Sequence, residues 1–410
     1  MRVLVVGAGI VGLCCAWYLQ EHSVDVAVLD RARVGAGASW GNAGYVSPAH
    51  ATPLPEPAML RSGLRALVDP RAPVAVPLRG DRARARFLVG LLRHCTDARW
   101  HRSMRAYLPL NESALAAHQE LADGGVRARC VSADMLVAFG SARQARGELD
   151  ELSRMAASGQ RIDVDLLTGD QARELEPALS SRIGCGVLVR GQCYIHPPDY
   201  LAALASAVRE RGAIITEGAS VHTVRRVGDQ VLASTRAGEH IEADAVVLAN
   251  GAWLGRLAAP HGVRMPVHAG RGYSFSLPTS APLTRPVRLP SARLALTPYG
   301  EGRIRVAGMM EFADPDEPLA PRRIRSMAEA LAPLLNGLDW AGRRQDWVGA
   351  RPLSTDGVPL VGRTATRGVY VAGGHGMWGI TLGPVTGRLL AASIVTGRTP
   401  PELAPLNPLR

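Results

Sequence analysis

The sequence predicts a mixed α/β protein, with one part of alternating strands and helices and a second part of antiparallel strands and helices. Three observations support this prediction. Residues 2–30 contain a β-branched run, a glycine-rich loop, an apolar stretch and a second β-branched run. Residues 197–258 and 369–396 return to this alternation, whereas residues 264–312 show successive strand patterns. With 410 residues and 47% hydrophobic side chains, the chain is long enough for two cores.

The first predicted strand, residues 2–6, leads into the loop Gly7-Ala8-Gly9-Ile10-Val11-Gly12 and then into an apolar helix. In this spacing the first glycine permits a tight turn, the second lets the backbone approach a pyrophosphate, and the third lets the helix pack on the strand. The helix N-terminus presents unpaired N–H groups to phosphate. A second strand, residues 24–30, ends at Asp30, where a carboxylate meets a ribose hydroxyl. The chain is therefore predicted to bind a dinucleotide.

The N-terminal run has a competing interpretation as a targeting segment, because residues 3–20 carry no charge. Three glycines interrupt the run, only Arg2 precedes it, and no small-residue cleavage site follows it. We therefore expect the mature protein to begin here and to be cytoplasmic. The sequence suggests no long helix compatible with lipid.

All 47 basic residues are arginine, and the formal net charge is +11. These arginines are scattered along the chain, which is typical of a solvated surface and argues against nucleic acid as a partner. The absence of lysine excludes Schiff-base catalysis through lysine and a lysine ammonium beside the cofactor.

The six cysteines form no Cys-x-x-Cys pair, so disulfides and a metal site are not expected; they are Cys14, Cys15, Cys95, Cys130, Cys185 and Cys193.

Two segments after the first strands differ in composition from the rest. Residues 48–77 contain seven prolines, which exclude a continuous helix and predict an extended crossing segment. Residues 79–105 contain eight arginines interleaved with apolar side chains, which predicts a basic amphipathic helix. Such a helix either packs on its own domain with its arginines in water or docks on an anionic membrane face.

Further along the chain, helical spacing of apolar residues alternates with short strand-like runs. The predicted helices cover residues 111–122, 144–157, 201–211 and 381–396. The predicted strands cover residues 135–139, 185–189, 213–217, 220–225, 241–249 and 369–372, and the region 264–312 includes a hairpin with its turn at residues 298–302. The strand 241–249 ends at the turn 250–253, which we expect to be another backbone contact with the dinucleotide.

A second glycine-rich loop, residues 373–379, lies between the predicted strand 369–372 and the C-terminal helix. Two glycine turns at opposite ends of the sequence imply one long cofactor that distant segments contact. Hydride chemistry on a nicotinamide does not require the second turn. FAD fits better, with its ADP half on the first turn and its flavin at the last helix N-terminus, whose positive end favours anionic reduced flavin.

Six strings of residues occur in order along nearly the whole chain: residues 6–12, 41–44 with 47–48, 271–274, 303–309, 347–352 with 356–363, and 374–376. In this order and spacing the sequence resembles the D-amino acid oxidase-like FAD oxidoreductases, and within that family the small-subunit type of bacterial D-amino acid dehydrogenase. The resemblance implies that the protein is an FAD-dependent enzyme.

The patterns and the resemblance together imply two domains. The first is a Rossmann-like FAD-binding domain built from the discontinuous segments 1–55, 197–258 and 346–410. The second is a substrate-binding domain with a mostly antiparallel sheet and helices, residues 56–196 and 259–345. The expected cofactor-binding residues are Gly7, Gly9, Ile10, Val11, Gly12, Asp30, Arg31, Ser39, Asn42, Ala43, Gly44, Val221, Ala249, Gly251, Trp253, Gly349, Gly374, His375, Gly376, Met377, Gly379, Ile380 and Thr381.

An amino acid substrate must be held by its carboxylate while its Cα–H points at the flavin N5. A planar guanidinium that grips both carboxylate oxygens fixes position and rotation. Arg351 is the candidate, because the resembling family places its carboxylate-binding arginine in this Gly-x-Arg-Pro string.

The remaining catalytic candidates each have a structural alternative. Tyr273 either bonds the carboxylate or closes the pocket, or it is an ordinary half-buried sheet residue. Tyr45 and His50 either line the substrate side of the flavin or pack structurally. His375 either contacts the ring or modulates its charge. Oxidase-like members have a substrate-binding tyrosine on the strand matching residues 293–297, where this chain has Ala295, so the oxidase substrate preference does not transfer directly.

The expected reaction is oxidative deamination of a D-amino acid, with hydride transfer from Cα to flavin N5 and hydrolysis of the imine to a 2-oxo acid and ammonia. The resemblance implies that the electrons pass to a quinone or another non-oxygen acceptor at the inner membrane. Two alternatives remain. One is an oxygen-using oxidase of glycine, D-hydroxyproline or a secondary metabolite that releases hydrogen peroxide. The other is a non-catalytic flavoprotein subunit that only transfers electrons.

Overall fold

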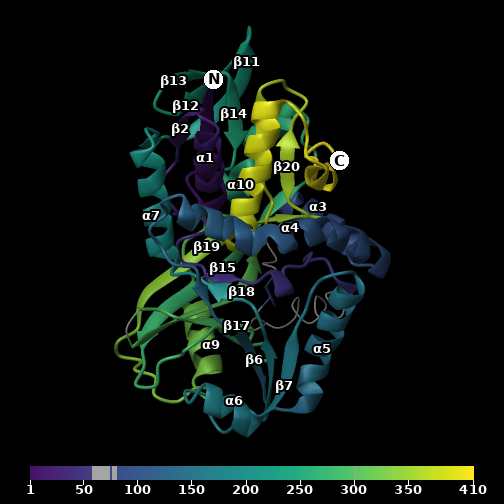
Figure 1. Ribbon diagram of the computed structural model, residues 1–410, viewed down its shortest axis with the longest axis vertical. Coiled ribbons are helices and arrows are strands. Elements are labelled where there is room, and N and C mark those ends of the chain that lie inside the picture. Colours follow the sequence, from purple (N-terminus) through teal and green to yellow (C-terminus); the bar gives the residue numbers. More distant parts are fainter. Residues whose placement is uncertain (58–73, 76–80, 301) are drawn as a thin grey trace.

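Two parts, each built around its own large β-sheet, are stacked along the long axis of the molecule in a computed structural model (Figure 1). The structure describes residues 1–57, 74–75, 81–300 and 302–410. The mixed α/β class predicted from the sequence is confirmed by the sheets and helices of both parts. Residues of the proline-rich segment beyond residue 57, apart from 74–75, lie outside the described residues, as do Arg79 and Glu301 of the predicted helix and hairpin turn.

The first part contains a six-stranded sheet with the order β10-β2-β1-β14-β21-β20. All neighbours are parallel except β20 and β21. Its strands are β1 (Arg2–Val6), β2 (Asp25–Leu29), β10 (Ile214–Thr216), β14 (Ala245–Leu248), β20 (Leu360–Arg363) and β21 (Val369–Gly373). Strands β1, β14 and β21 are almost continuously buried, as parallel strands covered on both faces are. The six strands come from the three chain segments that the sequence assigns to FAD binding.

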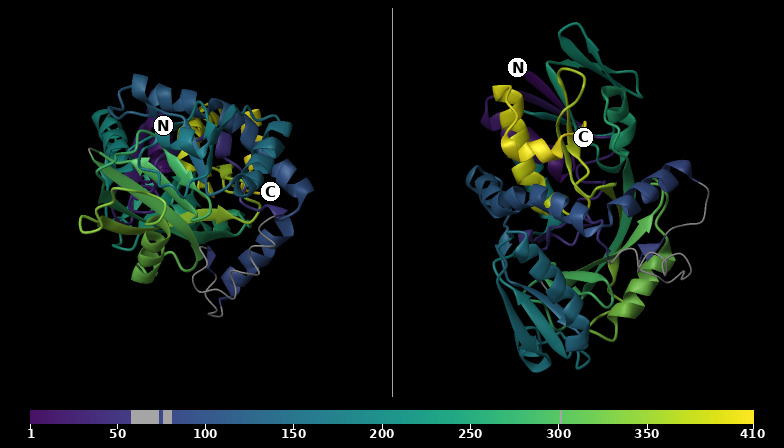
Figure 2. Two further views of the ribbon diagram at one scale, coloured as in Figure 1. Left: turned by 90° about the horizontal axis from the view of Figure 1, so that it is seen from below. Right: turned by 90° about the vertical axis from the view of Figure 1, so that its right-hand side faces the viewer.

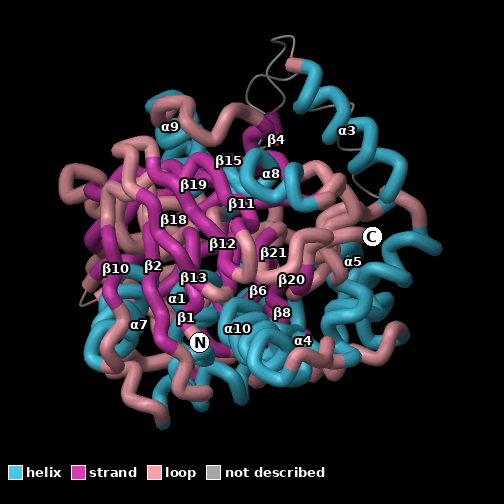
Figure 3. Tube along the Cα trace, turned by 90° about the horizontal axis from the view of Figure 1, so that it is seen from above, coloured by secondary structure: helices cyan, strands magenta, loops and turns pink. Residues whose placement is uncertain are grey.

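Helices α1 (Ile10–Glu21) and α10 (Gly379–Thr396) lie side by side on this sheet (Figure 3), with α7 (Pro197–Glu210) beside α1. The two helices approach closely because Gly387 of α10 has no side chain: a Cβ there would lie 2.6 Å from the backbone carbon of Cys14. Helix α10 is long and apolar enough to cross a membrane by length and composition, contrary to the expectation from the sequence. However, 67% of this helix is buried inside the protein, as in the core helix of a folded domain.

A separate three-stranded sheet contains β11 (Val221–Val227), β12 (Gln230–Thr235) and β13 (His240–Ala243). The single strand predicted over residues 241–249 is wrong, because it is divided between two sheets. Strand β13 pairs antiparallel with β12, whereas β14 pairs parallel with β1. Asp244 lies at the division and its carboxylate accepts a hydrogen bond from the Arg2 backbone N–H at 2.7 Å.

The second part contains a nine-stranded, mostly antiparallel sheet with the order β19-β15-β18-β17-β16-β6-β8-β7 and β4 beside β18. The strands are β4 (Val74–Ala75), β6 (Met135–Phe139), β7 (Val164–Thr168), β8 (Cys185–Val189), β15 (Val267–Pro278), β16 (Val287–Leu289), β17 (Leu294–Pro298), β18 (Arg303–Phe312) and β19 (Arg344–Ser354). Strand β19 pairs with β15 throughout, so most of residues 346–354 lie in this sheet. The predicted domain boundary at residue 346 assigns them instead to the FAD-binding part.

Smaller elements connect the two parts and cover the sheets. A three-stranded sheet contains β3 (Tyr45–Val46), β9 (Cys193–Tyr194) and β5 (Val131–Ser132). Helices α5 (Ala142–Ala157), α6 (Gly169–Leu175) and α9 (Pro321–Leu331) belong to the second part (Figure 1). Short helices occur at η1 (Pro48–His50), η2 (Gly251–Trp253), α8 (Leu254–Ala258), η3 (Ala259–His261) and η4 (Pro401–Leu406).

The arginine-rich segment forms two helices, α3 (Arg82–His94) and α4 (Asp97–Asp123), where the sequence predicts one helix over residues 79–105. The break has a local cause: Thr96 caps α4, and its side chain accepts a hydrogen bond from the Arg99 backbone N–H. The helix predicted over residues 111–122 is the second half of α4, which continues through Pro109. Helix α4 crosses the molecule between the two parts (Figures 1 and 2).

His118 of α4 fixes the start of α10. Its Nδ1 accepts a hydrogen bond from the Tyr200 hydroxyl at 2.9 Å, and its Nε2 donates to the Ile380 carbonyl at 3.0 Å. Burial lowers the pKa of His118 from 6.5 to about 4. Between pH 6.5 and pH 4, His118 is protonated in the unfolded chain but neutral in the folded protein. Its contribution to the free energy of unfolding is therefore complete above pH 6.5 and is lost as the pH falls toward 4.

We expect His118→Gln to remove part of this pH dependence. In the wild-type protein, protonation of His118 in the unfolded chain should lower the free energy of unfolding by about 2 kcal/mol between pH 7.5 and pH 5. Urea unfolding of the flavin-loaded protein at both pH values measures the difference, and the variant should show a correspondingly smaller fall. An identical fall in both proteins would contradict the assignment.

Candidate active site

A cavity of about 720 Å³ opens where the two parts meet. Strands β1, β2 and β21, helix α1, the turn at η2 and the glycine loop before α10 contribute its lining from the first part. Strand β19 and the loop after β18 contribute from the second part. The predicted residues that line it are Gly7, Gly9, Ile10, Val11, Asp30, Arg31, Ser39, Asn42, Val221, Ala249, Gly251, Trp253, Arg351, His375, Gly376, Met377, Gly379 and Ile380.

The first glycine turn is shaped by close backbone contacts. Gly7 has φ +114°, and a Cβ there would lie 2.5 Å from the Ala249 carbonyl oxygen. A Cβ on Gly12 would lie 1.9 Å from the Gly7 oxygen, so only glycine lets α1 pack on this turn. The N-terminus of α1 therefore faces the cavity, where its partial positive charge attracts phosphate; the Ile10 N–H in this turn donates to the Ser39 hydroxyl at 3.1 Å.

Asp30, at the end of β2, holds the same turn. One carboxylate oxygen accepts a hydrogen bond from the Ala8 N–H and the other accepts one from the Ala32 N–H, both at 2.8 Å. Burial raises the pKa of Asp30 above its usual value despite these hydrogen bonds. The carboxylate lines the cavity where the sequence predicts contact with a ribose.

The second glycine turn, residues 373–379, is tied to β19. The Gly376 N–H donates to the Pro352 carbonyl at 2.8 Å, and His375 forms a bridge with Leu353. The His375 Nε2 lies 2.9 Å from the Thr386 hydroxyl, while its buried Nδ1 has no partner among the described residues. Burial lowers the pKa of His375 to about 4. The imidazole is therefore neutral near pH 7 and supplies no positive charge to the cavity.

Arg351 brings a positive charge into the cavity from β19. Its Nη1 donates to the Met309 carbonyl at 2.7 Å and lies 3.9 Å from the Met310 sulfur. No carboxylate among the described residues pairs with it, and burial lowers its pKa from 12.5 to about 10. By contrast, Arg271 has the carboxylate of Glu311 and Arg288 that of Glu148. A partly buried guanidinium that lines a cavity and has no carboxylate partner among the described residues is suited to bind an anion.

Arg305 is buried and also has no carboxylate partner among the described residues, but it differs from Arg351. It lies outside the cavity lining and donates to three oxygens, those of the Gly41 carbonyl, the Ser274 hydroxyl and the Gln345 carbonyl. Its hydrogen bonds therefore serve to join β18 to neighbouring segments, not to bind a ligand.

Gly272 of β15 makes room for the Arg351 guanidinium. A Cβ at this position would lie 2.2 Å from Nη2 of Arg351.

We expect Gly272→Ala to push the flexible guanidinium aside without unfolding the protein, and to lower kcat/KM about tenfold or more, because small misplacements of a positioning group are costly. Flavin reduction at limiting substrate and thermal unfolding provide the two measurements. Gly147→Ala, with no atom near its Cβ in α5, is the control; equal kcat/KM in both variants would contradict the role of Gly272.

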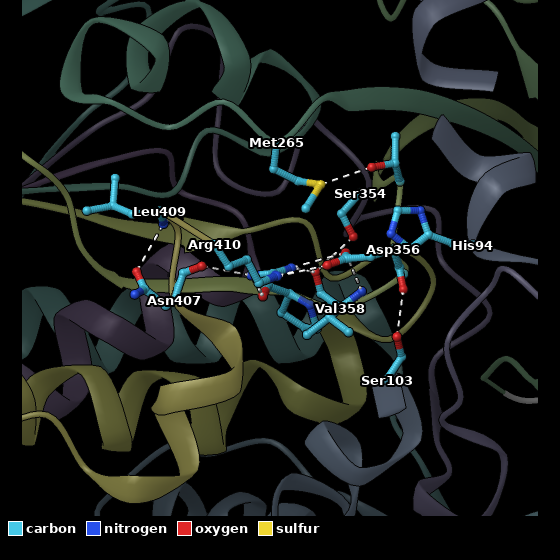
Figure 4. A network of polar contacts seen from close by, with 12 residues as sticks. His94, Ser103, Met265, Ser354, Asp356, Val358, Asn407, Leu409 and Arg410 are labelled. Carbon is cyan, nitrogen blue, oxygen red and sulfur yellow. Dashed lines mark hydrogen bonds and ion pairs between the residues drawn. The ribbon is translucent and has the colours of Figure 1, made fainter. Parts of the chain in front are cut away.

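The chain beyond Arg351 is fixed by a polar network (Figure 4). The Arg410 guanidinium grips both oxygens of the Asp356 carboxylate, at 2.8 and 3.1 Å. The Ser103 hydroxyl donates to the Asp356 carbonyl, and the Ser354 hydroxyl donates to the Val358 carbonyl. Strand β19 is thus held at its end by α4 and by the last residues of the chain. The sequence offers the string 356–363 as a family match but no signal for Arg410.

Three predicted catalytic residues are not brought to the cavity, and their contacts explain why. The Tyr273 hydroxyl donates to Glu311 at 2.6 Å within a buried core. The Tyr45 hydroxyl donates to the Val287 carbonyl at 2.7 Å and accepts from the Leu296 N–H. His50 is buried between the Ser47 hydroxyl and Glu148. Their placement is a correction to the sequence-based site, since all three are structural contacts here.

Six predicted cofactor-binding residues do not line the cavity: Gly12, Ala43, Gly44, Gly349, Gly374 and Thr381. Some of them shape the site indirectly. Gly12 packs α1 on the first turn, and the Thr381 hydroxyl joins α10 to the Tyr45 carbonyl at 3.2 Å. Sequence reasoning missed other lining residues, for which no motif gives a signal: His222, Arg236, Arg256 and Asp316.

The residues of the cavity fit a dinucleotide that carries a redox group. The cavity lining includes the first turn, where Gly7 and Gly12 leave no room for a Cβ, and a second turn in which Gly374 and Gly376 have positive φ. Two helix N-termini also contribute to the lining. Asn250 and His375 line the cavity, and the buried Oδ1 of Asn250 and Nδ1 of His375 have no hydrogen-bond partner among the described residues. The fold and this site together define a flavin-dependent oxidoreductase.

Comparison with known proteins identifies the family. A family model described as FAD dependent oxidoreductase (DAO) matches residues 2–393. The chain is 32% identical over 412 residues to a D-amino acid dehydrogenase of Cereibacter sphaeroides, covering 98% of this chain and 93% of the relative. It is 31% identical to a D-amino acid dehydrogenase of Xylella fastidiosa, covering 95% and 91%.

The chain belongs to the DAO family of FAD-dependent oxidoreductases, and FAD is its cofactor, as the sequence predicts. Among solved structures, glycine oxidase from Geobacillus kaustophilus is similar with a TM-score of 0.76 and 24% identity, covering 100% of this chain and 99% of that one. This likeness confirms the predicted fold.

Proposed function

We propose that the protein catalyses the oxidative deamination of a D-amino acid and passes the electrons to a quinone or another acceptor that is not oxygen. The observation that carries the proposal is Arg351, a partly buried guanidinium that lines the FAD cavity without a carboxylate partner among the described residues. The names of the relatives in Cereibacter and Xylella support the D-amino acid as substrate and the dehydrogenase type of acceptor.

The residues of the chain act mainly by binding and orientation. Arg351 grips the substrate carboxylate, and the Met309 carbonyl fixes the angle of its guanidinium. When bound, FAD supplies the acceptor for the two electrons that leave with hydrogen from the substrate Cα. Neutral His375 leaves Arg351 as the charge that attracts the carboxylate at this end of the cavity. The substrate binds with a neutral amine, and water hydrolyses the resulting imine to a 2-oxo acid and ammonia.

Anaerobic mixing of the yellow protein with a panel of amino and imino acids tests this proposal. D-amino acids should bleach the flavin absorbance, whereas their L-enantiomers should not. Reoxidation by a soluble quinone should be faster than by air, with little hydrogen peroxide. Rapid reoxidation by oxygen with stoichiometric peroxide would identify an oxidase instead. A flavin that no substrate bleaches would identify an electron-transfer subunit.

We further propose that α3 docks on an anionic membrane, from which a lipophilic acceptor would reach the site. Its outer face exposes Arg82, Arg86 and Arg93 together with Val89 and Leu92, whose exposed fractions are 49% and 48%. Its inner face packs in an apolar cluster with residues that include Met377, which lines the cavity. A basic face with exposed apolar side chains fits a negatively charged lipid surface.

Replacing Arg82, Arg86 and Arg93 together with glutamine should weaken binding to vesicles of anionic lipid about 100-fold, since each arginine near the surface contributes about 1 kcal/mol. Cosedimentation with vesicles at low salt measures the effect. The matched control replaces the exposed arginines Arg143, Arg146 and Arg209, which lie on α5 and α7. Equal loss in both triple variants would refute docking through α3.

A further inference from the structure

The loop between β18 and α9, residues 313–320, reaches from the second part to the rim of the FAD cavity. Pro315 and Asp316 of this loop line the cavity beside Arg31 and Trp253 of the first part. The Asp316 carboxylate accepts hydrogen bonds from Arg31 Nη2 at 2.6 Å and from the Trp253 indole N–H at 3.1 Å. The Arg31 guanidinium also lies 4.2 Å from the centre of the Trp253 ring. These three side chains, here called the latch, contact one another in the lining of the cavity and so join the two parts there.

The base of the loop is fixed, whereas the latch is exposed. Arg271 is only 2% exposed, and its Nη2 donates to the backbone carbonyls of Glu317 and Pro318 at 2.7 and 2.8 Å. The Glu311 carboxylate holds Arg271 in place. The Asp316 and Arg31 side chains are 49% and 45% exposed. The loop is therefore anchored at Glu317 and Pro318, and the Asp316 N–H donates to the Asp314 carboxylate at 2.9 Å, whereas the Asp316 side chain makes contacts that water and salt reach.

The charges favour the closed arrangement. Burial opposes the negative charge of Asp316, but hydrogen bonds from Arg31 and Trp253 outweigh it and hold the pKa of this carboxyl below its usual range. Arg256, another cavity residue, also stabilises the carboxylate. An exposed ion pair is weak alone, and the indole hydrogen bond and the cation–π contact add to it. Contacts of this strength keep the latch formed most of the time and still let it open by thermal motion.

We propose that the Asp316 latch is a gate through which FAD enters and leaves its cavity. The loop tip must swing away from Arg31 and Trp253 before a dinucleotide can pass. The proposal rests on FAD binding and is independent of the amino acid substrate, so flavin exchange tests it without turnover. A gate that forms both with and without FAD changes the rates of entry and release together and leaves the dissociation constant nearly unchanged.

Asp316→Asn tests the gate, because it removes the charge and keeps an oxygen for the Trp253 indole. FAD release into excess scavenger apoprotein and FAD rebinding are followed by flavin fluorescence. Both rates should rise about fivefold, with the dissociation constant changed less than about twofold. Asp229→Asn, which breaks the exposed Arg226–Asp229 pair far from the cavity, should leave both rates unchanged. Unchanged rates in Asp316→Asn, or faster release without faster rebinding, would overturn the proposal.

Salt dependence and a double-mutant cycle provide a second readout. Raising the salt concentration screens an exposed ion pair, so release from the wild-type protein should accelerate while release from Asp316→Asn should not. Arg31→Gln should raise the entry rate to the same extent, and the double variant should add nothing further. Additive effects of the two substitutions on the rate of FAD entry would show that Arg31 and Asp316 act separately, which would contradict the latch proposal.

Discussion

Replacing Arg351 with alanine is expected to lower the rate of flavin reduction by amino acids by a factor of about a hundred to several thousand while the protein stays yellow. Removing one partner of a buried ion pair costs about 3–5 kcal/mol, which corresponds to this factor. The loss falls on the substrate because no carboxylate of the described residues pairs with Arg351. Anaerobic stopped-flow absorbance measures the rate, and the flavin spectrum reports retention of the cofactor.

Two further variants control the Arg351 experiment. Arg351→Lys keeps a charge but loses the planar fork, so it should recover only part of the rate. Arg344→Ala removes an exposed arginine from the same strand and should leave the rate unchanged. A normal rate of reduction in Arg351→Ala would mean that another group holds the carboxylate.

Replacing Gly7 with alanine is expected to give a colourless protein. The residue has φ +114°, which alanine rarely adopts, and the new Cβ would lie 2.5 Å from the Ala249 carbonyl oxygen. Relief of this overlap requires β1 and β14 to separate at the turn that carries the N-terminus of α1, at a cost of several kcal/mol, so FAD affinity should fall more than about 100-fold. Equilibrium titration of the apoprotein with FAD measures the affinity.

Gly255→Ala is the control for Gly7→Ala. Gly255 lies in α8, has no positive φ, and has no atom within 4 Å of the added Cβ. This variant should bind FAD normally, since alanine is a better helix former than glycine. Tight binding of FAD by Gly7→Ala would contradict the geometry described for the first turn.

Local patterns in the sequence predicted the elements that place the cofactor. The first strand, the turn 7–12 and helix α1 follow from β-branched runs, glycine spacing and apolar periodicity, and all are confirmed. The strand 369–372 and the helix 381–396 are confirmed within two residues as β21 and α10. Arg351 was predicted from a family string. The structure adds that its guanidinium lines the cavity without a carboxylate partner among the described residues, which no local pattern predicts.

Contacts between distant residues explain what the sequence could not predict. Tyr45 is held by residues 242 and 251 positions away, and Glu148, which contacts His50 together with the nearby Ser47, is 98 positions away from it. Their residue types suit a substrate pocket, and only the fold shows that their polar atoms are bound elsewhere. Asp316 and Trp253 meet across 63 residues, so the latch has no sequence signal. Similarly, β13 and β14 appear as one strand because pairing partners, not local propensity, divide them.

Hydrogen–deuterium exchange of the apoprotein and of the FAD-loaded protein tests most directly whether the two glycine turns hold one cofactor. Peptides that cover residues 7–12 and 373–379 should both gain protection when one FAD per chain binds. The peptides of the exposed β11–β12 hairpin tip should not change, because the tip lies away from the cavity. Protection at the first turn with no change at residues 373–379 would contradict the proposed placement of the flavin.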